Sequence, residues 1–252
     1  MKVALVGYGK MGRAVEELAP AKGFDVVDRF VRDRPLRADE LTRHRIAGAT
    51  LIDFSTADAV LDTVQSAARL SLNVVIGTTG WSDRIEDVRR VVEASDIGVV
   101  YAANFSVGVN VFYRLVDEAA RLLSALDGYD AFILDWHHRF KKDSPSGTAL
   151  EIQKRMARYY GERLVPITSQ RAGYVPSLHA VGFDSEADTI YMEHRTRSRR
   201  GLAEGALLAA VWIAGHPGFH EFREVLDSVL ESRGSLGARQ DRENLARSTT
   251  RR

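Results

Sequence analysis

The stretch "KVALVGYGKMGRAVEELA", residues 2–19, decides the fold of the amino-terminal part of this chain. A short apolar run leads into Gly7, Gly9 and Gly12, which form a G-x-G-x-x-G pattern where a segment of helical period begins. The first glycine of such a pattern permits a tight turn, the second admits a pyrophosphate, and the third lets helix and strand pack closely. The phosphate meets unpaired amides at the helix start. This predicts a dinucleotide site, with a purely structural turn as the alternative; the residues assigned to it are Gly7, Gly9, Lys10, Met11 and Gly12.

Outward from this turn, short apolar runs alternate with segments of helical period as far as residue 105. The runs are "KVALVG", "FDVVDRFV", "TLIDFS", "NVVIGTT" and "IGVVYAANF". Repeated alternation of strand and helix is typical of a parallel sheet that is covered on both faces. We therefore expect residues 1–105 to form a Rossmann-type, doubly wound α/β domain.

An acid at the end of the second strand of such a domain holds the ribose hydroxyls. The segment "VVDRFVRDRP" offers Asp28 within the strand and Asp33 just after it. Asp33 is the better placed, and Asp28 is expected at an edge or on the surface. Arg32 and Arg34 flank Asp33 and would instead pair with a ribose phosphate. NADH and NADPH therefore both remain open, as does an ordinary charged loop.

Ligands of open α/β sheets bind outside the carboxyl ends of the strands. The segments "DFSTAD", "GTTGW" and "AANFSVG" follow the later runs and are expected to be ligand loops. Gly77, Thr78 and Thr79 offer amides and hydroxyls without bulk, which suits an amide or a ribose. Asn104 and Phe105 are expected to orient and cover a nicotinamide ring, and Ala103 beside them is assigned to the cofactor site.

Residues 106–215 are expected to form a second, α+β domain. The segment "VGVNVFYRLVDEAARLLSALDG" predicts a long helix, whose inner side is expected to hold Val111, Phe112, Leu115, Ala119, Leu122 and Leu126. The strands predicted after it are less uniformly apolar and indicate a mixed, largely antiparallel sheet. A helix over residues 216–232 is expected to complete the first domain. Residues 233–252 lack apolar periodicity and predict a disordered tail.

The stretch "DWHHRFKKDSPSGTAL", residues 135–150, carries most of the chemistry. We expect Ser144 to cap a helix whose first turn includes Pro145. Such a helix start attracts anions. Its small residues are Ser146, Gly147 and Thr148.

Two histidines and a lysine lie just before this helix start. His137, His138 and Lys141 beside an anion site are suited to binding a small polycarboxylate and transferring a proton. Metal binding is the rival interpretation. It needs three or four ligands, and no nearby carboxylate and histidine arrangement supplies them, so we expect no metal.

Composition excludes several other classes of function. The 252 residues carry a formal net charge of +1 and are 45% hydrophobic, so a sizeable core is expected but no overall attraction to nucleic acid or to an anionic membrane. The absence of cysteine excludes disulfides and thiolate chemistry. The opening apolar run is too short for a spanning helix and is not followed by a cleavage pattern. We expect a cytoplasmic protein.

From Lys2 to about Leu230 the sequence closely resembles the 4-hydroxy-tetrahydrodipicolinate reductase family, also called dihydrodipicolinate reductase. "VGYGKMGRAVEELA" resembles the family's opening, "GTTGW" and "AANFSVGVN" its nicotinamide loops, and "HHRFKKDSPSGTAL" its signature, H-H-x-x-K-x-D-x-P-S-G-T. The resemblance implies that His137 is the catalytic acid/base and Lys141 its partner. It implies that the substrate carboxylates are bound by His138, Ser146, Gly147 and Thr148.

The resemblance also implies NADPH or NADH as hydride donor, a homotetramer and a place in lysine and diaminopimelate biosynthesis. "RAGYVPSLHAVGF" is similar to a family segment leading to a histidine, here His179, although Ser177 and Leu178 replace the usual glycine and acid. The implied reaction adds hydride to ring carbon four of a cyclic imine dicarboxylate and a proton, from His137, to carbon three. Another two-domain amino-acid dehydrogenase and a non-catalytic cofactor-sensing protein are the alternatives.

Overall fold

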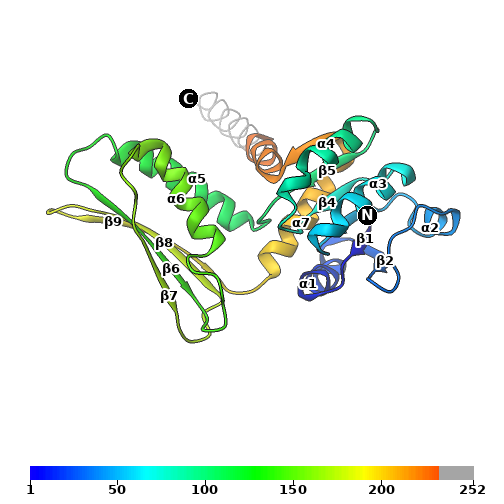
Figure 1. The fold of residues 1–252 in the computed structure, drawn as a ribbon, viewed down its shortest axis with the longest axis horizontal. Helices are drawn as coiled ribbons and strands as arrows, with labels where there is room; N and C mark the ends of the chain where they lie inside the picture. Colours follow the sequence, from blue (N-terminus) through cyan, green and yellow to red (C-terminus); the bar gives the residue numbers. More distant parts are fainter. Residues whose placement is uncertain (233–252) are drawn as a thin grey trace, which may run out of the picture. The chain divides into compact units, whose positions relative to one another are not determined.

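The computed structural model describes residues 1–232, so the tail expected over residues 233–252 lies outside the described residues (Figure 1). The described residues form two compact units, one comprising Met1–Phe105 and residues 203–232, the other Ser106–Leu202. The second domain was expected to extend to residue 215. Residues 203–215 instead belong to the first unit, because their packing partners lie there: a Cβ on Gly205 would lie 1.7 Å from the carbonyl oxygen of Phe105.

The first unit contains a sheet of six strands, all parallel, in the order β10-β5-β4-β3-β1-β2. Its strands are β1 (Lys2–Val6), β2 (Asp25–Phe30), β3 (Thr50–Asp53), β4 (Val74–Ile76), β5 (Gly98–Tyr101) and β10 (Gly218–Glu221). The order changes direction at β1, which has β2 on one side and β3 on the other. This arrangement confirms the predicted doubly wound fold and places the ligand crevice at the carboxyl ends of β1 and β3.

Helices connect these strands and cover the sheet (Figure 1). They are α1 (Lys10–Leu18), α2 (Glu40–Arg45), α3 (Val60–Leu70), α4 (Ile85–Glu93) and α7 (Arg200–Trp212), with 3-10 turns η1 (Pro20–Lys22), η2 (Ala57–Ala59), η3 (Ser82–Arg84) and η4 (Ile213–Gly215). All four residues of β3 are buried, as expected for a strand with both faces covered. Val64, Val88 and Val92 pack against the strands in one continuous core.

The helix expected over residues 216–232 is only partly correct. Residues 218–221 form β10, which pairs with β5 as an edge strand, and the helix occupies residues 222–232. Pro217 has a fixed φ and no N–H, which favours a break before this strand. The helix buries Phe222, Val225 and Leu226 in the first unit.

The second unit is a mixed sheet with helices on one face (Figure 1). Its strands lie in the order β7-β6-β8-β9, with bounds β6 (Asp130–His137), β7 (Ile167–Arg171), β8 (Ser177–Asp184) and β9 (Thr189–Thr196). Only the β6 and β7 pair is parallel. Helices α5 (Val107–Leu123) and α6 (Gly147–Tyr160) form the core with Ile133 and Val181. No helix within residues 1–232 is long and apolar enough to cross a membrane.

The inner side of α5 differs from the one expected. Leu115, Leu122 and Leu126 are 54%, 51% and 55% exposed, whereas the buried residues of this helix are Val109, Phe112, Tyr113, Val116, Ala120 and Leu123. Apolar residues occupy two adjacent stripes of this helix, and both have helical period. Periodicity alone therefore could not select the stripe that meets the sheet.

Candidate active site

The carboxyl end of β6 brings two functional side chains onto one face of the second sheet. Side chains alternate along a strand, so Asp135 and His137 point the same way. They point toward α5 and α6, and only 1% of Asp135 and 6% of His137 is exposed. A buried carboxylate needs several donors to offset the loss of water.

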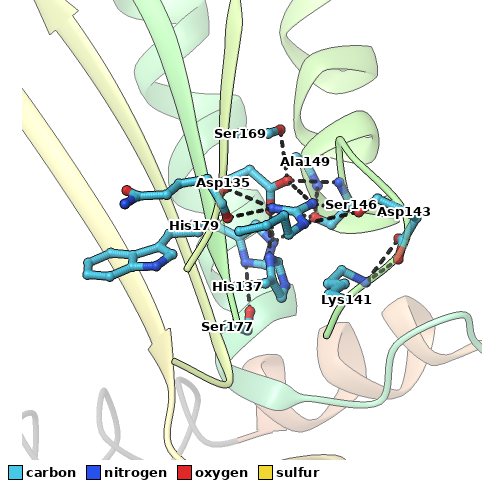
Figure 2. Close-up of polar contacts among 12 residues, drawn as sticks. Asp135, His137, Lys141, Asp143, Ser146, Ala149, Ser169, Ser177 and His179 are labelled. Carbon is cyan, nitrogen blue, oxygen red and sulfur yellow. Dashed lines mark hydrogen bonds and ion pairs between the residues drawn. The ribbon is translucent and has the colours of Figure 1, made fainter. Parts of the chain in front are cut away.

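Those donors come from the loop before α6 and from β7 (Figure 2). Oδ2 of Asp135 accepts hydrogen bonds from the Ser146 amide at 2.8 Å, from Ser169 Oγ at 3.1 Å and from Arg171 Nη2 at 2.8 Å. Oδ1 accepts from Ser146 Oγ at 2.8 Å. Burial alone would raise the pKa of Asp135, but interactions with His137, His179, Arg171 and the Ser146 amide hold it far below its usual range. Asp135 is therefore a carboxylate under all ordinary conditions.

His137 lies directly against this carboxylate. Its Nδ1 is 2.9 Å from Oδ1 of Asp135, an ion-pair distance without the alignment of a hydrogen bond. Because Nδ1 faces Asp135, Nε2 on the other side of the ring is the nitrogen placed to exchange a proton with a ligand. The contact with Asp135 therefore orients the imidazole ring by one nitrogen and leaves the other for a ligand.

His179 completes the buried polar cluster, and its ring meets that of His137 edge-on at 5.1 Å. Its Nε2 lies 3.0 Å from Ser146 Oγ, and its Nδ1 lies 3.2 Å from Ser177 Oγ. The Ser146 hydroxyl gives its proton to Asp135, so Nε2 of His179 must carry the proton in this pair. Burial lowers the pKa of His179, which favours the neutral ring. Although Ser177 and Leu178 stand where the family has a glycine and an acid, β8 is regular here, and His179 pairs with Asp135 across the sheet.

The cap of α6 is Ser146 and not Ser144. Ser146 Oγ accepts a hydrogen bond from the Ala149 amide at 3.2 Å, and α6 begins at Gly147. The Ser146 amide already donates to Asp135, so the amides of this helix start that could still meet a ligand are those of Gly147 and Thr148. A Cβ on Gly147 would have no atom within 4 Å, which leaves open space for a ligand.

Lys141 and His138 lie in the loop between β6 and α6. Nζ of Lys141 binds both carboxylate oxygens of Asp143, at 2.8 and 2.9 Å, and this interaction lowers the pKa of Asp143 (Figure 2). Arg171 donates to the carbonyl oxygen of Asp143 at 2.7 Å, which ties the loop to β7. A carboxylate ligand would compete with Asp143 for Lys141. Nδ1 of His138 is buried and has no hydrogen-bond partner within residues 1–232.

One set of potential metal ligands comes together from two strands, β6 and β8, although no metal site was expected. Donor atoms of Asp135, His137 and His179 lie within 4.8 Å of one another. His179 comes from a distant strand, so the set was not visible in the local sequence. However, the guanidinium of Arg171 already binds the carboxylate of Asp135, and the positive charge of Lys141 helps to lower the pKa of His179. These cations make the cluster better suited to an anion and a proton than to a metal.

The residues predicted to bind the dinucleotide lie in the first unit. A cavity of about 830 Å³ is lined by Gly7, Gly9 and Arg32 and by the loop after β3. A Cβ on Gly12 would lie 2.4 Å from the carbonyl oxygen of Gly7, whereas a Cβ on Gly9 would have open space. These two environments match the packing role of the third glycine and the ligand role of the second. Lys10 and Met11 form the first turn of α1 without lining this cavity.

Asp53 joins two of the predicted ligand loops. It is fully buried and accepts hydrogen bonds from the Ser55 amide at 2.8 Å, from Ser55 Oγ at 2.6 Å and from Thr78 Oγ1 at 2.8 Å. Burial raises the pKa of Asp53. Gly77 has no room for a side chain, because its Cβ would lie 2.0 Å from the ring of Phe54.

The other predicted nicotinamide residues differ in exposure. Thr79 and Ala103 are exposed and Asn104 is half-buried. Phe105 is 1% exposed and packs between Phe54 and Phe222, at ring distances of 6.4 and 4.8 Å. Its side chain therefore supports the loop from within the unit rather than presenting a free ring face.

Comparison with known proteins settles the family. The description "Dihydrodipicolinate reductase, N-terminus" matches residues 1–105, and "Dihydrodipicolinate reductase, C-terminus" matches residues 108–226. The chain belongs to the dihydrodipicolinate reductase family. It is 33% identical over 243 residues to the 4-hydroxy-tetrahydrodipicolinate reductase of Christiangramia forsetii, covering 92% of this chain and all of the relative. Identity to the Archaeoglobus fulgidus enzyme of the same name is 35% over 262 residues, covering 90% and 100%.

Solved structures confirm the fold of a dihydrodipicolinate reductase. A dipicolinate-bound dihydrodipicolinate reductase from Paenisporosarcina sp. TG-14 has a TM-score of 0.75 at 19% identity, covering 89% of this chain and 98% of that one. GenD2 from gentamicin A biosynthesis, in complex with NAD, has a TM-score of 0.54 at 12% identity, covering 89% and 90%. As a member of this reductase family, the chain is an oxidoreductase that takes hydride from NADH or NADPH.

Sequence reasoning missed part of the site. Asp135 stands two residues before His137, a spacing that puts both on one strand face, so alternation could have found it. Arg171 and Ser169 had no such signal, because they reach Asp135 through the parallel pairing of β6 with β7.

Proposed function

We propose that this protein reduces 4-hydroxy-tetrahydrodipicolinate, or its dehydrated form, to tetrahydrodipicolinate in lysine and diaminopimelate biosynthesis. The observation that carries the proposal is the buried pair of Asp135 and His137, beside Lys141 and the open helix start at Gly147. This arrangement offers cationic and amide contacts to a small dicarboxylate and one imidazole that can transfer a proton.

Substrate binding is assigned to the start of α6 and the loop before it. The amides of Gly147 and Thr148 and the Lys141 ammonium would hold the carboxylates, with His138 beside them. Ser146 would act through Asp135 and the helix cap, since both its polar groups are used within the protein. Charges fixed in place in this way stabilise the negative charge that develops as the ring becomes an enamine.

Proton transfer is assigned to His137. The nicotinamide supplies the hydride to ring carbon four, and the protein supplies orientation and charge. Nε2 of His137 would deliver the proton to carbon three, while Asp135 stays ionised and holds the ring by its other nitrogen. An imidazole is suited to this step because it exchanges protons near neutral pH.

The test is a coupled assay with the folded full-length protein. The preceding synthase generates the substrate from pyruvate and aspartate semialdehyde, and the absorbance of NADH or NADPH is followed. We expect His137→Gln to lower kcat about 100-fold or more, because general acid catalysis contributes about this much. His44→Gln, an exposed histidine on α2, is the matched control and should retain the wild-type rate.

Two results would reject this assignment. A wild-type rate in His137→Gln would remove the proposed acid. No oxidation of either cofactor by wild-type protein that binds it would indicate a different substrate or a cofactor sensor.

The proposal extends to assembly and location. The face of the second sheet opposite α5 and α6 carries Phe132, Leu134 and Trp136 of β6, which are half-buried in the single chain. Covering this apolar face with the same face of other subunits would form a homotetramer, the state implied by the resemblance. We place the reaction in the cytoplasm, where reduced nicotinamide cofactors are regenerated.

A further inference from the structure

The part of the cavity that selects between nicotinamide cofactors lies just after β2. In a doubly wound domain this strand end meets the adenosine ribose, where an acid binds the 2′-hydroxyl or an arginine accommodates a 2′-phosphate. Here β2 ends at Phe30, and the next residues, Val31 and Arg32, line the cavity together with Gly7 and Gly9. The first position after the strand is thus apolar and the second cationic.

Neither nearby acid lines the cavity. Asp28 is 5% exposed and does not line the cavity. Its two carboxylate oxygens lie 2.7 Å from Arg34 Nη2 and 2.6 Å from Arg45 Nε, so its charge is neutralised within the protein. Asp28 thus lies on an edge strand of the sheet, one of the two places expected for it, but it is buried and not on the surface. Asp33 is exposed and also lies outside the lining.

Arginines dominate the lining instead. Arg32, Arg37 and Arg69 all contribute to it, and within residues 1–232 none of them lies within 4.0 Å of a carboxylate. Among the described lining residues the single acid is Asp62, on the first turn of α3 rather than at the end of β2. The cavity therefore presents unpaired positive charge where a ribose substituent would lie.

We infer that this protein binds NADPH in preference to NADH, with Arg32 holding the 2′-phosphate and Arg37 and Arg69 adding positive charge around it. The inference rests on the proposed function only for the presence of a dinucleotide in this cavity. A doubly charged phosphate gains charge-assisted hydrogen bonds from a guanidinium, whereas a neutral hydroxyl gains little from it. For NADH, the site also offers no carboxylate at the end of β2 to accept hydrogen bonds from the ribose hydroxyls.

Calorimetric titration of the full-length protein tests the preference without relying on turnover. The probes are NADP⁺ against NAD⁺, and adenosine 2′,5′-bisphosphate against AMP. Hydrogen bonds to charged groups lead us to expect about tenfold or tighter binding of the phosphorylated member of each pair. The difference should shrink in high salt, because all three arginines are exposed to solvent.

Variants assign the preference to particular residues. Arg32→Ala should weaken NADP⁺ binding about tenfold or more and leave NAD⁺ binding unchanged. Arg84→Ala removes the same charge from the first unit outside the cavity lining and should change neither.

The outcomes separate this inference from the proposed function. Equal binding of NADP⁺ and NAD⁺ by the wild type, or equal losses for both in Arg32→Ala, would overturn the preference while leaving a dinucleotide enzyme. Failure of the folded protein to bind any dinucleotide would overturn both.

Discussion

Asp135 organises the candidate active site, although it would not touch the substrate. Its carboxylate accepts hydrogen bonds from Ser146, which caps α6, and from the guanidinium of Arg171, and it lies against the ring of His137. A buried carboxylate with this many donors is stable, but removing it would leave buried donors without an acceptor, which would destabilise the fold. Asp135 is therefore a positioning residue that sets the direction of the His137 ring.

Replacing Asp135 with Asn tests this role. We expect Asp135→Asn to lower kcat by at least about tenfold, because the same change behind the catalytic histidine of serine proteases costs far more. The KM for the cofactor, whose proposed site lies in the other unit, should stay near its wild-type value. Steady-state kinetics measures both parameters, and circular dichroism checks that the variant is folded. Asp130→Asn, an exposed position on the same strand, is the control. Equal losses in the two variants would contradict the assignment.

The pKa of Asp53 is shifted in the opposite direction to that of Asp135, because burial raises it. A folded state that holds its proton more tightly than the unfolded chain becomes less stable as the pH rises above the ordinary value of 3.8. Below that value both states are protonated and no penalty remains. Asp53→Asn keeps an acceptor for Ser55 and Thr78 but carries no charge.

We expect Asp53→Asn to gain stability relative to the wild type as the pH rises. Melting temperatures of both proteins at pH 4 and pH 8 check this, and the difference should be larger at pH 8. A constant difference across this range would show that the carboxyl group of Asp53 titrates alike in the folded and unfolded chains.

At the scale of elements, the turn between β1 and α1 separates two functions of glycine. Gly12 packs against the Gly7 carbonyl, whereas Gly9 faces open space and has an ordinary φ of −83°. We expect Gly12→Ala to lower stability by about 1–3 kcal/mol, as overpacking does. Gly9→Ala should fold with wild-type stability and bind the dinucleotide more weakly, because its methyl group would occupy the space of the pyrophosphate.

Urea unfolding and dinucleotide titration of both variants distinguish the two roles. Equal destabilisation by both alanines would mean that Gly9 also has a purely structural role.

Helices and strands could be predicted from the sequence where their residue pattern was compatible with only one structure. The buried strands before Gly7, Gly77 and Ala102 form as expected, because uniformly apolar runs between helical segments favour a covered parallel sheet. The cap of α6 was misplaced by two residues, because Ser144 and Ser146 have the same local propensity and only a buried partner, Asp135, distinguishes them. The strand β10 was missed, since a four-residue edge strand is defined by its pairing with β5.

The candidate site was predictable to the same extent. The sequence placed His137, Lys141 and Gly147 in one segment because they are neighbours in the chain. It could not place Arg171 and His179 beside them, because those contacts depend on the register of β6 with β7 and β8.

At the scale of the whole molecule, the open face of the second sheet predicts association. Leu134 lies on this face, opposite the helices, and an arginine there would put charge into the proposed subunit contact. We expect Leu134→Arg to reduce the molar mass measured by light scattering from that of a tetramer toward that of smaller species.

Leu115→Arg provides the matched control, since Leu115 is an exposed leucine on the helical side of the same unit. It should leave the assembly intact. Dissociation by Leu115→Arg with an intact assembly in Leu134→Arg would place the contact on α5 instead.

The chain leaves the first unit at Phe105 and returns to it at Ala203. During synthesis from the amino terminus, the complete second unit therefore emerges from the ribosome while the first still lacks β10, most of α7 and the helix over residues 222–232. Until then the edge of β5 and the pocket that receives Phe222 stay uncovered, so the nascent first unit is the part at risk of aggregation. Translation that stops after Leu202 would release a chain with a complete second unit and an incomplete first one.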